Sequence, residues 1–220
     1  MWENHDPEQI ANIDTWKKNI ALVHRFYNDR RGGLANAQPN AAHHMIKKLQ
    51  DTYGAKVFTQ NVDDLFAKAG CEAIQVHGTL TEMLCVSCGR TWDIGYGEWS
   101  HEDRCECGSE WVKPNVVFFG EHAPHYSEMW ADLTSMAKGD ILLVMGTSGS
   151  VIPIGSVANR VKYRSVTTIL SNLETNTLPN FIGDPQIQDG QFQYVRHGRA
   201  SEKADEIYAL IEEIIENGTE

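Results

Sequence analysis

Four cysteines lie close together near the middle of the chain, at a spacing that suits a bound metal ion. Cys85 and Cys88 are separated by two residues, sixteen residues follow, and Cys105 and Cys107 are separated by one. Such pairs form short chelating turns, and the glycine after each pair allows a tight turn. Four thiolates complete a tetrahedral zinc shell and leave no position for water, so we expect a structural zinc ion. The alternative is a chance cluster of reduced thiols.

A histidine and a polar run form the second group of candidate residues. Residues 56–59 are a short strand candidate that leads into Gln60, Asn61 and Asp63, and a second apolar run leads into His77. Because α/β proteins place ligands at the carboxyl ends of strands, we expect these side chains near a binding site. An imidazole with a pKa near ~6.5 can act as a general base at neutral pH. Taken singly, these residues have ordinary alternatives as a structural histidine, helix caps or loop formers.

Alternating helices and strands are expected to position these residues. The expected helices begin at Asp6-Pro7, at Asp14 (ending at Gly32-Gly33), at Pro39-Asn40 (ending at Gly54), at Pro153 and at Ser201; the expected strands span residues 56–59, 140–145 and 166–170. The run 140–145 is continuously apolar, which is typical of a strand buried on both faces of a parallel sheet. The pattern predicts a doubly wound α/β fold, with residues 176–190 as the longest loop.

Composition limits the class of partner. The chain has 220 residues, of which 41% are hydrophobic, enough for one domain with a small insertion. A net charge of −11 and a pI near 5.2 argue against nucleic acid or anionic lipid as the partner. The first residues lack the pattern of an export signal, and the longest apolar run, 141–145, is too short to cross a bilayer. We therefore expect a cytoplasmic protein with reduced cysteines.

Seven stretches, in this order, resemble the sirtuin family over nearly the whole chain. They are residues 59–63 (Thr-Gln-Asn-Val-Asp), His77-Gly78, the cysteine quartet, residues 114–121 (Pro-Asn-Val-Val-Phe-Phe-Gly-Glu), Gly146-Thr147-Ser148, residues 171–174 (Ser-Asn-Leu-Glu) and Gly198-Arg199-Ala200. The resemblance implies a Rossmann-like NAD-binding domain in two parts, 1–80 and 114–220, with a zinc-ribbon insertion at 81–113. It also implies NAD-dependent removal of acyl groups from lysines in proteins or peptides, giving nicotinamide and O-acyl-ADP-ribose.

The resemblance further implies a role for each matching residue. For NAD, it implies that Gln60, Asn61 and Asp63 surround nicotinamide and its ribose, that Gly146, Thr147 and Ser148 hold phosphate and ribose, that Asn172 and Glu174 bind the adenosine ribose, and that Ala200 passes near the adenine. For the substrate, it implies that Val117, Phe119, Gly120 and Glu121 pair with the peptide and line the lysine tunnel. It also implies that His77 is the general base. Such a base would take a proton from a ribose hydroxyl after nicotinamide has left.

Tyr27 and Arg30 form a further candidate pair. They are three residues apart on an expected helix, so they project from the same face, where a phenol beside a guanidinium can receive a carboxylate. In the ordinary alternative, Tyr27 completes an apolar stripe and Arg30 is a solvated charge. The Tyr-x-x-Arg pattern resembles the sirtuin class that recognises succinyl- and malonyl-lysine, which implies removal of those groups as well as acetyl.

The sequence lacks one feature of the family. Sirtuins open with a strand, a Gly-Ala-Gly-x-Ser phosphate loop and an arginine-containing loop, whereas Met1-Trp2 already resembles the residues that follow both. We expect either an upstream start or a reduced member in which the first strand is absent and sheet edges are exposed. Two alternative functions stay open: a catalytically silent, zinc-stabilised module that binds a peptide or nucleotide, and an NAD hydrolase without a protein substrate.

Overall fold

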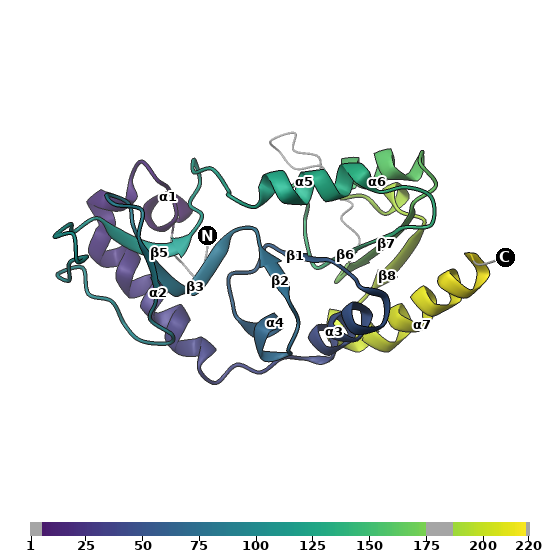
Figure 1. The fold of residues 1–220 in the computed structure, drawn as a ribbon, viewed down its shortest axis with the longest axis horizontal. Coiled ribbons are helices and arrows are strands. Elements are labelled where there is room, and N and C mark those ends of the chain that lie inside the picture. The colour runs from purple at the N-terminus through teal and green to yellow at the C-terminus, as the bar shows by residue number, and fades with distance from the viewer. Residues whose placement is uncertain (1–5, 175–186, 219–220) are drawn as a thin grey trace. The chain divides into compact units, whose positions relative to one another are not determined.

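The computed structural model describes residues 6–174 and 187–218, which form two compact units (Figure 1). The described part of the first unit comprises residues 6–39 and 56–126, and that of the second comprises 40–55, 127–174 and 187–218. The expected insertion at 81–113 lies within the first unit. The three-part division at residues 80 and 113 stays a prediction.

The first unit opens with helices. α1 (Pro7–Ile10) is capped by Asp6, whose side chain accepts a hydrogen bond from the backbone N–H of Glu8, as expected. A 3₁₀ turn, η1 (Trp16–Asn19), then leads into α2 (Ile20–Leu34). The expected cap at Asp14 is wrong, because its backbone N–H is held by the Asn12 side chain in a turn before the helix.

The expected end of α2 at Gly32-Gly33 is also wrong. The helix continues through both glycines to Leu34, and the backbone N–H of Ala35 still bonds to the Gly32 carbonyl. Glycine weakens a helix by about 1 kcal/mol without removing its hydrogen bonds, so tertiary packing overrides it here.

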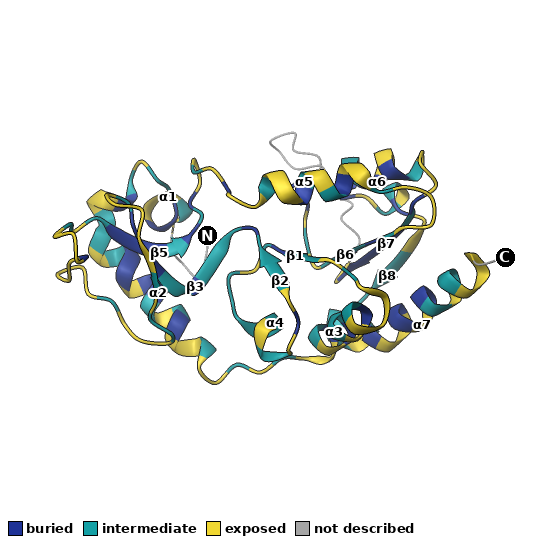
Figure 2. Cartoon of the chain, viewed as in Figure 1, coloured by how far each residue is buried: buried dark blue, intermediate teal, exposed yellow. Residues whose placement is uncertain are grey.

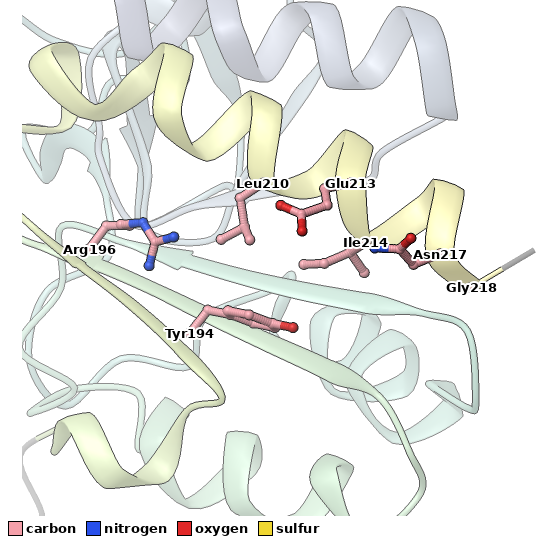
Figure 3. Close-up of a pocket in the computed structure, with 7 residues that line it drawn as sticks. All are labelled: Tyr194, Arg196, Leu210, Glu213, Ile214, Asn217 and Gly218. Carbon is pink, nitrogen blue, oxygen red and sulfur yellow. The ribbon is translucent and has the colours of Figure 1, made fainter.

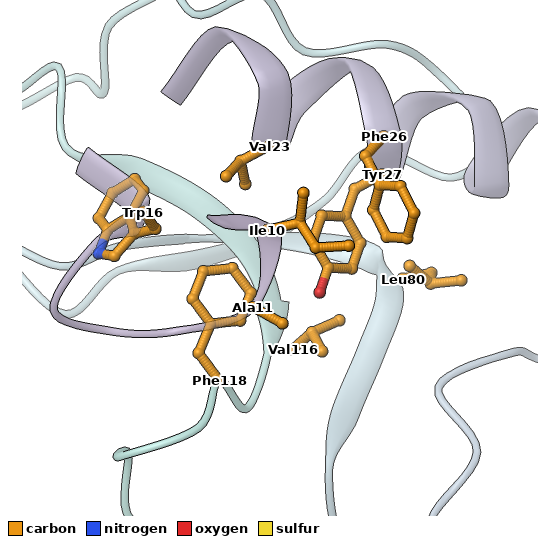
Figure 4. Packing of buried hydrophobic residues seen from close by; sticks show 9 residues of the cluster. All are labelled: Ile10, Ala11, Trp16, Val23, Phe26, Tyr27, Leu80, Val116 and Phe118. Atoms are coloured by element: carbon orange, nitrogen blue, oxygen red, sulfur yellow. The ribbon is translucent and has the colours of Figure 1, made fainter. Parts of the chain in front are cut away.

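Apolar side chains of α1, η1 and α2 form the first core of this unit (Figure 4). The buried members of the cluster are Ile10, Ala11, Trp16, Val23, Phe26, Tyr27, Leu80, Val116 and Phe118. Its aromatic rings make edge contacts between Trp16 and Phe118 and a stacked contact between Tyr27 and Phe118. The helices are therefore anchored on the strands that carry Leu80 and Val116.

Two short parallel strands follow the helices in the first unit. β1 (Val57–Thr59) pairs with β2 (Ala73–Gln75), and α4 (Leu65–Lys68) lies between them in the chain. Thr59 and Gln75 are partners in the register, so the residues after each strand emerge at the same edge. This edge receives the polar run 60–63 and His77.

An antiparallel sheet completes the first unit. Its order is β4 (Thr91–Asp93), β3 (Gly78–Cys85) and β5 (Val112–Val116). A second small core lies here, with Met83, Cys85, Cys105 and Val112 buried and tryptophans packed around them. Because so few apolar side chains are buried in this sheet, its stability depends on further cross-links between its turns.

The second unit is a parallel sheet covered by helices. Its order is β6 (Ile141–Met145), β7 (Thr167–Asn172) and β8 (Tyr194–His197). α3 (Ala41–Tyr53) and α7 (Ala200–Gly218) lie side by side on one face, and α6 (Ile154–Lys162) lies on the other, which Figure 1 shows together with α5 (Tyr126–Ser135). Figure 2 shows the buried faces that α3 and α7 turn toward each other.

α3 follows the expectation closely. Asn40 caps it by accepting from the backbone N–H groups of Ala42 and His43, and Gly54 ends it in the left-handed conformation. Residues 42, 45 and 49 are buried, as the apolar stripe predicts. Local capping and periodicity therefore agree with the tertiary packing in this helix.

Three other expectations for this unit need correction. β6 is not fully buried on both faces, since Leu142 and Val144 are buried while the alternate side chains are half-buried against helices that cover them only in part. Ser201 does not cap α7, because the helix begins at Ala200 and the Arg199 carbonyl accepts its first bonds.

Two elements of the structure, β8 and α5, were not expected from the sequence. Of the expected loop 176–190, residues 176–186 lie outside the described residues, and 189–191 form a 3₁₀ turn.

The expected α/β class is confirmed, but the parallel strands form two sheets. Among the described residues, β1 pairs only with β2 and β6 pairs only with β7, so each unit has its own parallel sheet instead of a share in one. No described helix is long and apolar enough to cross a membrane.

Gly78 provides a test of the contact between β3 and β5. Its φ is +82°, and a Cβ at this position would lie 2.0 Å from the Asn115 carbonyl oxygen. Gly78→Ala should lower the stability of the first unit by about 3 kcal/mol or more, from left-handed strain plus overpacking. Gly139→Ala is the control, because its φ is +96° with no atom within 4 Å, so only about 1–2 kcal/mol is expected. Urea unfolding followed by tryptophan fluorescence would measure both; equal losses would contradict the assigned contact.

Candidate functional site

The four clustered cysteines converge as expected. Their sulfur atoms all lie within 4.8 Å of one another. Cys85 Sγ is 3.7 Å from Cys107 Sγ, and Cys88 Sγ is 3.8 Å from Cys105 Sγ. Zinc–sulfur bonds of about 2.3 Å in a tetrahedron put neighbouring sulfurs about 3.8 Å apart, so these residues fit a four-thiolate zinc site.

The two cysteine turns are closed in a similar way, although the closing bond spans four residues in the first and three in the second. The N–H of Gly89 bonds to the Cys85 carbonyl, and the N–H of Gly108 bonds to the Cys105 carbonyl. Gly89 and Gly108 both have positive φ, as the tight turns require. The shorter spacing of the second pair is therefore compatible with a second chelating turn.

His77 lies two residues after the end of β2, at the edge where β1 also ends. Its Nδ1 is 3.2 Å from the Gln60 carbonyl oxygen, and its Nε2 is 2.7 Å from the Tyr126 hydroxyl. Burial lowers the pKa of His77, and the bond to the Gln60 carbonyl partly offsets this. The imidazole is consequently neutral at neutral pH, which is the form that a general base needs.

The polar run after β1 surrounds this edge. The Asn61 N–H bonds to the Thr59 hydroxyl, and the Asn61 side chain is exposed. The Asp63 carboxylate accepts from the N–H of Leu65 at the start of α4, so the alternative role as a helix cap is also filled. Gln60, Asn61 and Asp63 are thus brought to one strand edge with His77.

The segment after β5 is tied to His77 by its backbone. The N–H of Val117 donates to the His77 carbonyl at 2.9 Å. The N–H of Phe119 donates to the Ala11 carbonyl, and its side chain is 46% exposed. Val117 and Phe119 therefore belong to an extended segment beside the histidine, whereas Phe118 points into the core.

A buried lysine holds the end of this segment. The Lys113 side chain is 1% exposed, and its ammonium lies 2.9 Å from the Glu121 carboxylate and 2.6 Å from the Val116 carbonyl. Glu121 also accepts from the N–H of Phe118. Gly120 makes the turn between them with φ of +87°. Glu121, predicted as a substrate residue, is therefore engaged inside the protein.

Tyr27 and Arg30 lie on α2, as expected. Tyr27 is 2% exposed and stacks on Phe118, yet its hydroxyl has no hydrogen-bond partner among the described residues. Burial raises the pKa of Tyr27, and Arg30 partly offsets this. The Arg30 guanidinium lies over the Phe26 ring at 4.4 Å. Tyr27 thus combines the apolar role of the alternative interpretation with an unsatisfied hydroxyl.

The predicted cofactor residues of the second unit lie at the carboxyl ends of its strands. The Asn172 side chain accepts from the Thr147 N–H at 3.1 Å and donates to the Thr147 carbonyl at 2.9 Å. The Asn172 carbonyl accepts from the N–H of Gly198, just before Ala200 begins α7. Asn172 thereby brings the ends of β6, β7 and β8 together.

The turn after β6 leaves polar groups available. Gly146 and Gly149 both have positive φ. The Ser148 side chain is exposed and its hydroxyl bonds to Ser150, while Glu174 is exposed beyond the end of β7. Hydroxyls, a glycine turn and a carboxylate at one sheet edge suit a nucleotide, which binds at such edges in α/β proteins.

A separate pocket of about 440 Å³ lies between β8 and α7 (Figure 3). Tyr194, Arg196, Leu210, Glu213, Ile214, Asn217 and Gly218 line it. None of the predicted site residues is among them, and Arg196 is paired with Glu206 of α7. The pocket is therefore distinct from both strand edges described above.

Tyr126, Lys113 and Phe118 were missed by the sequence analysis. Phe118 lies in the recognised stretch 114–121, and Lys113 lies directly before it. The apolar residues of this stretch were a signal for a packing partner of Tyr27. Tyr126 belongs to no recognised motif, and its partner His77 is 49 residues away in the chain. Only the fold reveals that contact.

The chain resembles known proteins over most of its length. A sequence profile described as the Sir2 family matches residues 1–153. An NAD-dependent protein deacylase of Helicobacter hepaticus is 35% identical, covering 79% of this chain and 76% of that protein. One of Pasteurella multocida is 32% identical, covering 92% and 83%.

Solved structures give the same result. The crystal structure of a Sir2 homologue in complex with NAD has a TM-score of 0.81 and 29% identity, covering 98% of this chain and 81% of that one. A mutant Sir2 homologue bound to ADP-ribose also has a TM-score of 0.81, with 29% identity and coverage of 98% and 84%. Profile, sequence and fold agree, and the chain belongs to the Sir2 family.

Proposed function

We propose that the protein removes acyl groups from protein lysines in an NAD-dependent reaction. The observation that carries this proposal is His77, a neutral, half-buried imidazole fixed at a strand edge beside the extended segment 116–120. Relatives named as NAD-dependent protein deacylases match over most of the chain. The partner is an acylated lysine in a protein or peptide.

Two sets of strand-end residues are the proposed NAD-binding groups. In the first unit, Gln60, Asn61 and Asp63 would surround the nicotinamide end of NAD. In the second, residues 146–148 with Asn172, Glu174 and Ala200 would bind the phosphate and adenosine end. Each set lies at the carboxyl ends of parallel strands, which supports this assignment.

The bound dinucleotide supplies an electrophilic ribose carbon once nicotinamide leaves. Val117 and Phe119 lie on the extended segment that would pair with the substrate peptide as an added strand. Their apolar side chains would exclude water around the lysine chain. His77 would then take a proton from a ribose hydroxyl, which makes that oxygen nucleophilic.

His77→Ala should separate the two halves of the reaction. Nicotinamide release in a single turnover should stay within about threefold, whereas free lysine should fall by about 10²-fold or more, since the base acts after nicotinamide has left. Rapid-quench assays with an acetylated peptide measure both products. His44→Ala, an exposed histidine on α3, is the matched control. Normal lysine release by the His77 variant would show that another group is the base.

The metal has a structural role in this proposal. Four thiolates leave no open position for substrate or water, so Cys85, Cys88, Cys105 and Cys107 would hold zinc as a cross-link between two turns. The small core around Met83 and Val112 then needs the metal to persist, as in other domains where metal binding supplies folding energy.

We expect one zinc per chain, held by all four thiolates. Cys107→Ser should release zinc to a chelator far more readily than the parent protein, because a serine hydroxyl is a poor replacement for a thiolate. Cys71→Ser, which changes a buried cysteine outside the cluster, should keep the metal. Elemental analysis with a chromogenic chelator measures both. Freshly purified, reduced protein without zinc would refute the assignment.

The acyl group is the finer part of the proposal. Tyr27 offers a buried hydroxyl with no hydrogen-bond partner among the described residues, and Arg30 lies on the same face of α2. A carboxylate on the acyl chain, as in succinyl- or malonyl-lysine, would satisfy the hydroxyl and pair with the guanidinium. Both groups then favour an acidic acyl chain over acetyl.

Arg30→Met should reduce desuccinylation about ten- to a hundred-fold and leave deacetylation nearly unchanged. A charge-assisted contact of this kind contributes roughly 1.5 to 3 kcal/mol, while methionine keeps the packing on Phe26. Arg25→Met, on the same helix at an exposed position, controls for a general loss of positive charge. The measurement is kcat/KM on matched succinyl and acetyl peptides. Equal loss on both peptides would mean that Arg30 only supports the fold.

A further inference from the structure

Both ring nitrogens of His77 already have hydrogen-bond partners. Nδ1 faces the Gln60 carbonyl at 3.2 Å, and Nε2 faces the Tyr126 hydroxyl at 2.7 Å. A carbonyl can only accept, so the neutral ring carries its hydrogen on Nδ1. Nε2 then holds the lone pair, and the Tyr126 hydroxyl donates to it.

This arrangement fills the only acceptor position of the base. A neutral imidazole has one nitrogen lone pair for accepting a proton. A phenol oxygen that donates its hydrogen can still accept another hydrogen bond. Within the residues that the structure describes, the Tyr126 hydroxyl makes no hydrogen bond other than the one to His77.

A substrate hydroxyl that approaches His77 would therefore donate its hydrogen bond to the Tyr126 oxygen. The tyrosine is only partly buried, so its oxygen can be approached from outside. Its ring centroid is 5.8 Å from that of His77, and the two rings are tilted at 47°. Tyr126 therefore contacts His77 through its hydroxyl and not by face-to-face stacking of the rings.

The protonation states suit this direction of transfer. Burial raises the pKa of Tyr126, so the phenol keeps its proton at neutral pH. Burial lowers the pKa of His77, so the imidazole is ready to accept one.

We propose that Tyr126 relays the proton of the attacking ribose hydroxyl to His77, an inference that rests on the proposed deacylase function. The ribose O–H bond breaks and its proton joins the Tyr126 oxygen, while the Tyr126 O–H bond breaks and its proton joins His77 Nε2. The freed oxygen pair forms a bond to the acyl carbon, and the π pair of the C=N⁺ bond moves to nitrogen. The phenol is regenerated, and the positive charge passes from that nitrogen to the imidazolium.

Tyr126→Phe tests the relay because it removes the hydroxyl and keeps the ring. Lysine release should fall at least about fivefold, which is a part of the roughly 10²- to 10⁴-fold that general base catalysis contributes, while single-turnover nicotinamide release and the KM for NAD stay within about twofold. The assay uses the full chain, NAD and an acetylated peptide. Tyr163→Phe, at a side chain that is 92% exposed, should change nothing.

Solvent isotope effects give a readout that a structural role would not move. The parent enzyme should show a curved dependence of lysine release on the fraction of D₂O, because two protons move together. Tyr126→Phe should show a linear dependence from one proton.

The outcomes separate this inference from the proposed function. Loss of less than fivefold, equal loss of both half-reactions, or a linear dependence in the parent enzyme would overturn the relay. His77→Ala measured in parallel reports on the base itself. If that variant is inactive in lysine release while Tyr126→Phe is fully active, only the relay is wrong. If His77→Ala is fully active, the proposed base is wrong.

Discussion

The backbone hydrogen bond from Val117 to the His77 carbonyl links the two parts of the candidate site. It exists because Gly78, directly after His77, lets β3 approach the Asn115 backbone more closely than any side chain would permit. The register between β3 and β5 is irregular at this point. The imidazole and the segment proposed to receive the peptide are therefore linked by the backbone, so the fold sets the distance between the proposed base and the proposed substrate segment. Such preorganisation is a main source of catalytic rate.

Buried charges hold the surroundings of that element. Lys113 has its ammonium inside the protein, where burial lowers its pKa and Glu121 partly offsets this. A buried ion pair contributes little net stability, and its use here is to fix the path of residues 113–121. Arg31 is fully buried and donates to the carbonyls of Leu80 and Gly97, which ties α2 to the region of the cysteine cluster. These bonds fix α2 to β3 and to the loop that follows β4.

Local signals in the sequence predicted the parts of the fold that local chemistry decides. α3 has a capping asparagine, an apolar stripe and a terminal glycine that agree, and the cysteine quartet has spacing that few other sites require. β8 could not be predicted, because Tyr194-Val195-Arg196-His197 has neither an apolar run nor an alternating pattern, and its pairing with β7 decides its conformation. Gly32 and Gly33 predicted the wrong end for α2, because tertiary packing and not local propensity decides where this helix ends.

The sequence predicted which residues gather at the strand edge, but not the contacts between them. Gln60 and His77 were placed together by their strand ends, yet Tyr126 was missed because a lone tyrosine carries no pattern and its hydrogen-bond partner is far away in sequence. The apolar interpretation of Tyr27 and the receptor interpretation of Tyr27 with Arg30 are compatible, which sequence alone could not indicate. The ring packs and the hydroxyl is left without a partner among the described residues.

Release of nicotinamide from NAD, measured with and without an acylated lysine peptide, tests the central claim most directly. A protein-lysine deacylase releases nicotinamide in proportion to free lysine, and only when the peptide is present. Nicotinamide release that does not depend on the peptide would instead identify an NAD hydrolase. Absence of release under both conditions, with peptide or nucleotide still bound, would identify a binding module and contradict the account.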